Sequence, residues 1–248
     1  MKVVAIIQAR MGSTRLPGKV LRILGGATVL ANVIDRVRAV PAIDEIVVAT
    51  STDQQDDQLE EEASRCGVAV FRGSEKDVLS RYYEAAREFH ADVIVRITAD
   101  CPLLDPELVQ QMVSNFHASR NGDARLDYLS NALTRSYPRG LDAEVFSFSA
   151  LEKAHRAATE QFEREHVTPY IYQHPACFSI KEYVGEVDLS LHRWTLDTPE
   201  DYEFLRRVFD LLGNAAKDAR MQIVLDMLEK YPELIQINQQ VRQKALND

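Results

Sequence analysis

Short apolar runs alternate with amphipathic segments along the first half of the chain. The first run, VVAIIQ at 3–8, is apolar at five successive positions, which is typical of strands buried on both faces of a parallel sheet. Such alternation with short connections implies a mostly parallel sheet with helices on both faces. The pattern predicts strands over 3–8, 45–50, 68–71 and 93–98, and helices over 28–40, 56–66, 78–89 and 106–117.

The rhythm changes after about residue 120. Two turn-rich stretches, NGDARLDY and SYPRGLD, interrupt the alternation, and FSIKEYV at 178–184 reads as a strand outside it. We therefore expect one α/β domain over 1–248 with an inserted, antiparallel lobe at about 121–192. Within and after this lobe we predict helices over 149–158, 161–173, 200–212 and 219–230, with Pro169 interrupting the second, and a strand at RWTL, 193–196.

Composition and charge narrow the classes of function. The chain has 248 residues and a net charge of −9, which argues against nucleic acid as the main partner, because phosphate-backbone binding needs a basic face. No apolar run is long enough to cross a membrane, and the N-terminus has no signal-peptide cleavage site. Three scattered cysteines form no disulfide framework or zinc pattern, so we expect a cytoplasmic protein.

The cations are concentrated at the N-terminal end. No acidic residue precedes Asp35, whereas the loop ARMGSTRLPGK directly after the first strand carries Arg10, Arg15 and Lys19. Its small residues let backbone N–H groups approach an anion, and the loop lies where parallel sheets bind ligands. It is not a Walker loop, since the spacing differs and Val20 replaces the Ser or Thr. The candidate nucleotide-binding residues are Gln8, Ala9, Arg10, Gly12, Ser13, Thr14, Arg15 and Lys19.

The loop also resembles the signature of a known family. ARMGSTRLPGK is similar to the loop of nucleotidyltransferases that activate sugars, in the cytidylyltransferase branch with the acylneuraminate and 3-deoxy-manno-octulosonate enzymes and the spore-coat polysaccharide F-type proteins. Five further blocks follow in the expected order: FRGSEKDVLSRYYEAA, RITADCPLLDP, YPRGLDAEVFS, EREHVTPYI and RWTLDTPEDY. The resemblance implies a Rossmann-like fold, Mg²⁺-dependent transfer of a nucleoside monophosphate from CTP to a sugar or sugar acid, and a homodimer formed through the inserted lobe.

Two aspartates are the candidate metal ligands. Asp100 follows the strand at 93–98 and Asp197 follows RWTL, so we expect both at one edge of the sheet. Carboxylate oxygens suit Mg²⁺, which phosphoryl transfer uses to offset triphosphate charge. The alternative for both is helix capping, although Asp105 is a better cap for the fourth helix and Thr198 with Asp201 forms a capping box of its own. The candidate catalytic residues are Arg10, Lys19, Asp100 and Asp197.

The middle blocks supply candidates with open alternatives. Arg72 could reach a pyrimidine or a phosphate, and Arg81 could join it or form ion pairs on the helix surface with Glu84 or Glu88. A turn-rich cluster of Tyr137, Arg139, Asp142 and Glu144 could cover the sugar. Its two carboxylates could accept sugar hydroxyls or an amine, and Arg139 could face a sugar carboxylate. His166 is a ligand or a partly buried histidine with satisfied hydrogen bonds. The candidate substrate-binding residues are Tyr137, Arg139, Asp142, Glu144 and His166.

These residues predict attack by a sugar hydroxyl on the α-phosphorus of a nucleoside triphosphate, with release of pyrophosphate. Two alternatives stay open: a guanylyl- or uridylyl-transferring relative, and a nucleotide-binding module without catalysis. The triphosphate that best protects the protein against thermal unfolding would distinguish a guanylyl- or uridylyl-transferring enzyme from a cytidylyltransferase. Turnover with a sugar acceptor would distinguish an enzyme from a binding module.

Overall fold

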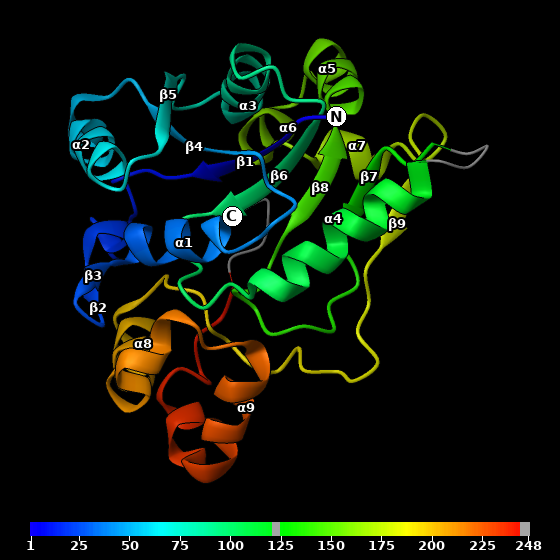
Figure 1. The fold of residues 1–248 in the computed structure, drawn as a ribbon. Helices are drawn as coiled ribbons and strands as arrows, with labels where there is room; N and C mark the ends of the chain where they lie inside the picture. The colour runs from blue at the N-terminus through cyan, green and yellow to red at the C-terminus, as the bar shows by residue number, and fades with distance from the viewer. Residues whose placement is uncertain (121–124, 244–248) are drawn as a thin grey trace.

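The structure is a computed structural model that describes residues 1–120 and 125–243. Residues 121–124, at which the inserted lobe was predicted to begin, lie outside the described residues. Within the described part, the predicted lobe contributes three strands to the same sheet as the first half of the chain. Figure 1 shows these strands continuing the sheet towards α4.

The central sheet has seven strands in the described part of the chain, in the order β5-β4-β1-β6-β8-β7-β9. The first four of that order are parallel; β8 runs antiparallel to both β6 and β7, and β9 is parallel to β7. This confirms the predicted α/β fold with a mostly parallel sheet. The strands are β1 (Val3–Gln8), β4 (Glu45–Ser51), β5 (Ala69–Gly73), β6 (Val93–Thr98), β7 (Tyr128–Ser130), β8 (Glu144–Ser147) and β9 (Ile180–Glu182).

Register brings the carboxyl ends of three strands together. Gln8, the last residue of β1, lies beside Ala49 of β4 and Thr98 of β6. The β1 interior is fully buried, with Val4, Ala5, Ile6 and Ile7 at 0% exposure, as its uninterrupted apolar sequence predicts. The loops that follow these strands therefore meet at one edge of the sheet.

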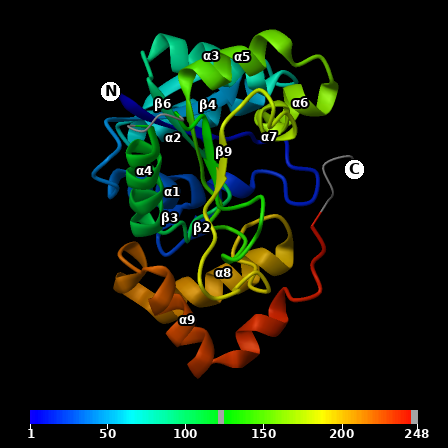
Figure 2. The same ribbon diagram turned by 90° about the vertical axis from the view of Figure 1, so that its right-hand side faces the viewer.

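Helices cover both faces of the sheet. The core on one face involves α1, α4, α8 and α9, and that on the other involves α3, α5 and α7. Figures 1 and 2 show α1 and α4 on one side, α3, α5, α6 and α7 on the other, and α8 and α9 beyond one end of the sheet. The helices are α1 (Val29–Arg38), α2 (Asp57–Arg65), α3 (Val78–Glu88), α4 (Pro106–Arg120), α5 (Phe148–Ala157), α6 (Gln161–His166), α7 (Pro169–Gln173), α8 (Pro199–Leu212) and α9 (Met221–Lys230).

One sequence prediction is wrong, one is confirmed and one element was not predicted. RWTL at 193–196 is not a strand: it makes only an isolated bridge between Arg139 and Arg193, although Trp194 and Leu196 are buried. The predicted interruption of the helix over 161–173 is confirmed, because this segment forms two helices and Pro169 takes the first position of α7. A small hairpin of β2 (Ile23–Leu24) and β3 (Ala27–Thr28) was not predicted, although its turn is Gly25-Gly26 with φ of 59° and 84°.

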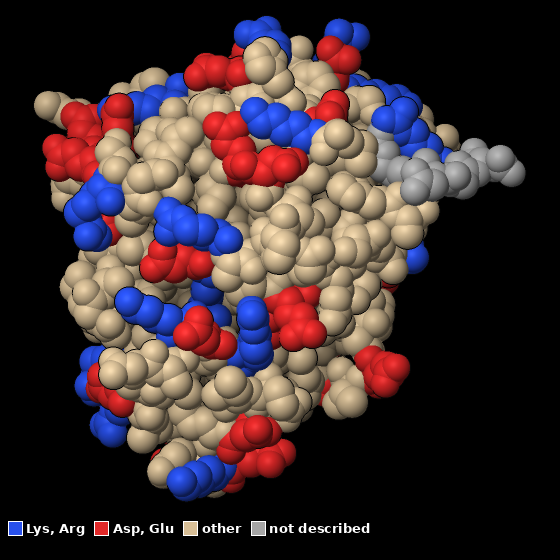
Figure 3. Space-filling model, in the orientation of Figure 1, with Lys and Arg blue, Asp and Glu red and all other residues tan. Residues whose placement is uncertain are grey.

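Charged side chains of both signs lie on the surface (Figure 3). Among the described residues, no helix is long and apolar enough to cross a bilayer. On the face shown in Figure 3, Lys and Arg side chains lie intermixed with Asp and Glu. That face carries no continuous basic surface of the kind a nucleic-acid backbone needs.

Candidate active site

The loop after β1 is held by a buried carboxylate. The backbone N–H of Met11 donates to Asp56 Oδ1 at 2.7 Å, while Asp56 Oδ2 accepts from the hydroxyls of Thr50 and Ser51. The loop closes on itself because the N–H of Gly18 donates to the Met11 carbonyl at 3.2 Å. Gly18 has φ 65°, a left-handed conformation in which glycine costs least. The loop is therefore held in this shape by contacts within the chain itself.

Lys19 lies between the two candidate aspartates. It starts the short 3₁₀ helix Lys19–Leu21, and its Nζ is 2.5 Å from Asp100 Oδ2 and 2.8 Å from Asp197 Oδ1. Burial alone lowers the pKa of Lys19, but the two carboxylates outweigh it, so this pKa lies above the ordinary value. Burial likewise raises the pKa of Asp100, and Lys19 outweighs that, so the pKa of Asp100 is lowered. Lys19 and Asp100 are therefore both charged at neutral pH.

Asp197 reaches this position without a strand. The N–H of Leu196 donates to the Asp100 carbonyl at 2.8 Å, and the Thr195 hydroxyl approaches the same oxygen at 3.3 Å. The second oxygen of Asp197 lies 3.2 Å from Arg15 Nη2 and 2.9 Å from Arg193 Nη2. The two aspartates thus converge as expected, but through loop-to-loop contacts. The predicted capping box of Thr198 and Asp201 is present at the start of α8.

A cleft of about 320 Å³ opens above the loop. It contains the predicted loop residues with one exception: Gly12 does not line it, and a Cβ at this glycine would face Gln55 and Glu75 instead. Arg10 is exposed at the cleft. The lining residues are Gln8, Ala9, Arg10, Ser13, Thr14, Arg15, Lys19, Val20, Arg96, Thr98, Ala99, Asp100, His166, Asp197 and Gln243. We call this the nucleotide cleft, after the binding role that the sequence predicts for its loop.

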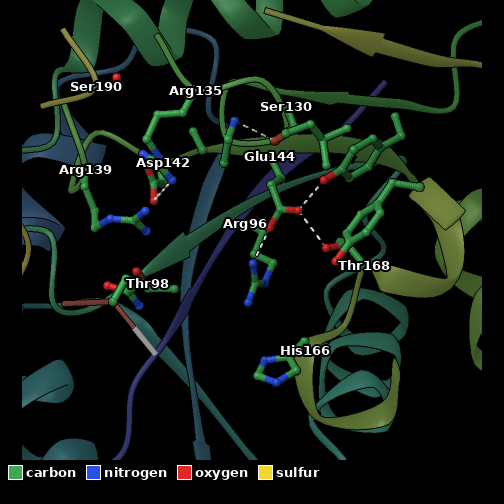
Figure 4. Close-up of a pocket in the computed structure, with 16 residues that line it drawn as sticks. Arg96, Thr98, Ser130, Arg135, Arg139, Asp142, Glu144, His166, Thr168 and Ser190 are labelled. Carbon is green, nitrogen blue, oxygen red and sulfur yellow. Dashed lines mark hydrogen bonds and ion pairs between the residues drawn. The ribbon is translucent and has the colours of Figure 1, made fainter. Parts of the chain in front are cut away.

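A second cavity of about 660 Å³ adjoins it and shares Arg96, Thr98, His166 and Gln243 with the cleft. We call it the acceptor pocket (Figure 4). Glu144, which is the first residue of β8 and not part of a turn, is buried there. The rest of the lining is Tyr128, Ser130, Ala132, Leu133, Arg135, Arg139, Asp142, Ala143, Thr168, Tyr172 and Ser190.

The carboxylates of the acceptor pocket are already paired. Asp142 accepts two hydrogen bonds from Arg135, at 2.5 and 2.9 Å. Glu144 forms an ion pair with Arg96 and accepts from the hydroxyls of Tyr128 and Thr168. Each carboxylate is therefore already paired with a cation of this chain, which weakens its attraction for an amine.

Arg139 differs from Arg135 and Arg96 because its side chain is not paired with a carboxylate among the described residues. Its side chain makes no hydrogen bond or ion pair with any residue of 1–120 or 125–243. Burial and the nearby Arg135 lower the pKa of Arg139, while Asp142 and Asp197 oppose the shift. Figure 4 shows its guanidinium beside the Arg135–Asp142 pair, with no dashed contact, directed into the cavity. His166, the last residue of α6, lies on the opposite side of the opening.

Besides Gly12, three predicted residues lie outside both cavities. Arg72 is turned toward α2, where it forms ion pairs with Asp57 at 2.7 Å and Glu60 at 2.9 Å. Tyr137 stacks on Tyr183 and lines a separate groove against α9. Arg81 is 2% exposed rather than on the helix surface; its Nη1 donates to the Ser74 carbonyl.

Sequence reasoning missed several residues of the site. Arg96 and Arg135 hold the pocket carboxylates, whereas Arg193 and Gln243 contact the Asp197 segment. Arg96 lies within the quoted block RITADCPLLDP, and its position inside an apolar strand was the available signal. Gln243 has no local signal, since only tertiary structure brings it to the site.

Similarity to known proteins extends over almost the whole chain. The sequence matches the cytidylyltransferase family model over residues 4–245. It is 37% identical over 235 residues to the spore coat polysaccharide biosynthesis protein SpsF of Bacillus subtilis, covering 92% of this chain and 94% of that protein. A cytidylyltransferase from Leptospira borgpetersenii superposes with a TM-score of 0.90 and 38% identity, over 99% of this chain and all of that one. A CMP:2-keto-3-deoxy-manno-octonic acid synthetase complexed with CTP superposes at 0.65 and 19% identity, over 85% and 99% of the two chains, which shows the same fold.

Proposed function

The chain belongs to the cytidylyltransferase family, and from that premise we propose that it transfers CMP from CTP to a hydroxyl group of an acidic sugar, releasing pyrophosphate. The observation that carries the proposal is the pair of adjoining cavities. One contains the cationic loop and the two aspartates, and the other contains Arg139, whose side chain is unpaired within residues 1–120 and 125–243. A triphosphate in the first and an acceptor in the second would meet at the shared residues.

The loop residues suit the triphosphate. Arg15 and Lys19 lie at the cleft with Ser13 and Thr14, so charge-assisted contacts and hydroxyl donors converge on one space. Arg10 adds an exposed guanidinium that is free to reach phosphate oxygens. These donors are in place before the reaction and stabilise the negative charge that moves onto the leaving pyrophosphate.

Asp100 and Asp197 fit a Mg²⁺ ion. Both carboxylates already approach one cation, Lys19 Nζ, within 2.8 Å, and hard oxygen donors are the ligands Mg²⁺ prefers. No group of three or more His, Cys, Asp or Glu residues suited to a metal occurs in the described ranges, so phosphates and water would complete the shell. The ion would supply neutralisation of triphosphate charge.

The acceptor pocket favours an anionic acceptor over an amino sugar. Its carboxylates are paired with Arg135 and Arg96, whereas the side chain of Arg139 has no hydrogen-bond or ion-pair partner among the described residues. A carboxylate on the acceptor would satisfy this guanidinium with a bidentate contact. His166 lies where the two cavities adjoin and is proposed to contact the acceptor near its reacting hydroxyl.

The homodimer and the cytoplasmic location remain predictions. Val187 and Leu191 of the inserted lobe are 65% and 94% exposed, as an apolar contact surface between two copies would require before association. Light scattering of the purified protein tests the dimer.

The test of the proposal is pyrophosphate release. The protein is incubated with Mg²⁺ and each of CTP, UTP, GTP and ATP, against sugar acids, neutral sugars and amino sugars. We expect release only with CTP and a sugar acid. Release with another triphosphate would establish the guanylyl or uridylyl alternative, and no release in any combination would establish a binding module.

A further inference from the structure

One side chain holds the segment that carries Asp197. The guanidinium of Arg193 donates from Nε to Asp201 Oδ1 at 2.8 Å, and from Nη2 to Asp201 Oδ2 and Asp197 Oδ2, both at 2.9 Å. Its third nitrogen, Nη1, donates to Gln243 Oε1 at 2.9 Å. All three nitrogens are therefore engaged in fixed directions. A planar guanidinium provides this geometry, and a lysine ammonium does not.

Asp201, the second carboxylate that Arg193 contacts, is held in place by burial and by several hydrogen bonds. Asp201 is 0% exposed and lies in the first turn of α8, where it accepts from the N–H groups of Asp197 and Thr198. Asn238 adds a further hydrogen bond to Asp201 Oδ1 at 2.9 Å and a second one to the Arg193 carbonyl. Arg193 thus links Asp197 to the rigid start of a helix.

The backbone of Arg193 is tied to the acceptor pocket. Residues on either side of it exchange hydrogen bonds with Arg139: the Arg139 N–H donates to the His192 carbonyl at 3.0 Å, and the Trp194 N–H donates to the Arg139 carbonyl at 2.6 Å. Arg139 itself lines the acceptor pocket. A single residue therefore fixes the spacing between the pocket cation and Asp197.

Gln243 brings the end of the described chain into the same place. It lines both the nucleotide cleft and the acceptor pocket. Its side-chain oxygen accepts a hydrogen bond from Arg193 Nη1, the nitrogen that contacts neither Asp197 nor Asp201. Neighbouring Gln240 is exposed and lines neither cavity, so the contact belongs to position 243 and not to the segment in general.

We propose that Arg193 and Gln243 are positioning residues of this site: Arg193 sets the orientation of the Asp197 carboxylate, and Gln243 holds the remaining nitrogen of Arg193 from the C-terminal segment. The placement of Asp197 rests on geometry alone, whereas the effect on rate rests on the proposed function. The two parts are tested by separate measurements.

The first measurement does not require turnover. Mn²⁺ binding to the full chain, without nucleotide, is followed by water proton relaxation in a Lys19→Ala background, in which no ammonium lies between the carboxylates. Arg193→Lys keeps the charge but loses the fork, so we expect Mn²⁺ affinity to fall by about tenfold, the scale of one charge-assisted hydrogen bond. Gln243→Met keeps length and charge, and we expect a fall of about threefold.

The second measurement uses the otherwise wild-type chain. Arg193→Lys and Gln243→Met are expected to lower kcat, by about a hundredfold and fivefold respectively, with KM for CTP unchanged within about twofold, as for a loss of transition-state geometry. Gln240→Ala is the matched control and behaves as wild type in both measurements. Melting temperatures are recorded for every variant, and Gln243→Met, at an exposed position, is expected to melt as wild type does.

Each outcome decides something different. No turnover of the wild type with CTP and any sugar acid overturns the proposed function but leaves the Mn²⁺ result valid. Mn²⁺ affinity that is unchanged in both Arg193→Lys and Gln243→Met, or absent altogether in the Lys19→Ala background, overturns the positioning role. A kcat loss that appears only together with a lower melting temperature, in Gln243→Met as well as Arg193→Lys, assigns these residues to stability alone and also overturns it.

Discussion

Lys19 and Asp197 are separated by 178 positions in sequence, yet the Lys19 ammonium donates to the Asp197 carboxylate at 2.8 Å. The same nitrogen lies 2.5 Å from Asp100. In this structure, the chain's own cation therefore occupies the space between the two carboxylates that we propose as metal ligands. A divalent cation and this ammonium compete for the same oxygens, so nucleotide and metal binding are linked through Lys19.

The first prediction concerns this competition. In Lys19→Ala, we expect CTP affinity to fall by about ten- to a hundredfold, because one charge-assisted phosphate contact is lost. Mn²⁺ affinity of the nucleotide-free protein is expected to rise, because the carboxylates lose their internal cation. Calorimetry with CTP and relaxation with Mn²⁺ measure the two effects. Lys76→Ala, at an exposed position outside both cavities, is the control, and a fall in both affinities would contradict the competition.

The second prediction concerns the two carboxylates. Asp100→Asn and Asp197→Asn each keep the shape of the side chain but remove a charged ligand. Turnover is expected to fall by several orders of magnitude in each, and the double variant is expected to be little worse, because groups that act as a unit are not additive. Pyrophosphate release under a Mg²⁺ titration measures this. Normal turnover in Asp100→Asn would sink the proposed metal site.

The third prediction is a pH dependence of stability. The pKa of Asp100 is lowered from 3.8, so its contribution to stability is present above pH 3.8 and is lost as pH falls through the folded-state value. The pKa of Lys19 is raised from 10.5, so its contribution is present below pH 10.5 and is lost as pH rises through the folded-state value.

The free energy of unfolding of wild type should therefore exceed that of Asp100→Asn between these limits, and the difference should shrink below pH 3.8. Denaturant titrations from pH 3 to 7 measure it. Asp35→Asn, which removes an exposed ion pair with Arg38, should show almost no difference at any pH. A difference that grows on acidification would contradict the pairing of Asp100 with Lys19.

The fourth prediction concerns acceptor choice. In Arg139→Gln, KM for a sugar acid is expected to rise by about ten- to a hundredfold, since one charge-assisted contact is lost, while KM for CTP stays constant. Steady-state kinetics with both substrates separate the two parameters. Arg156→Gln, on the exposed face of α5, is the control. A rise in KM for CTP instead would show that Arg139 contacts the nucleotide.

The fifth prediction concerns the join between the acceptor pocket and the Asp197 segment. Gly140 has φ 107°, and a Cβ there would lie 2.6 Å from the Trp194 carbonyl carbon and 2.7 Å from the Thr195 nitrogen. Gly140→Ala should lower the free energy of unfolding by about 3 kcal/mol or more, because backbone on both sides must shift. Gly26→Ala has a similar φ of 84° with open space and should cost about 1 kcal/mol. Equal costs in urea titrations would show that conformation alone, and not the close approach, requires Gly140.

The sequence predicted the sheet better than the site. Strand β1 has an uninterrupted apolar interior, and β4 and β6 are mostly apolar and buried at their centres, which leaves few other structures for them. Burial also explains why RWTL was wrongly predicted as a strand. Trp194 and Leu196 are just as buried as the strand residues, but their backbone is hydrogen-bonded to loops. Burial is visible in an apolar pattern, whereas the partner of each N–H group is not.

Charge clustering was informative but incomplete. Three cations in one loop predicted an anion among them, and the structure places two of this chain's own carboxylates beside Lys19 and Arg15. Arg72 shows the opposite limit. It lies near the carboxyl end of β5, where a ligand contact was expected. Its side chain instead pairs with Asp57 and Glu60, and this pairing depends on where α2 packs. A residue's position along a strand does not reveal which neighbour its side chain meets.

The hydrogen bond from the Leu196 N–H to the Asp100 carbonyl joins two segments that are far apart in sequence. The site can therefore form only after the later segment has been synthesised. The cationic loop and Asp100 leave the ribosome early, and β1, β4 and β6 can pair soon afterwards. Asp197 follows almost a hundred residues later, at roughly 5–20 residues per second. Until then Lys19 has one carboxylate partner instead of two. A nascent chain released before residue 197 thus contains the complete loop and most of the sheet, but lacks the second half of its carboxylate pair.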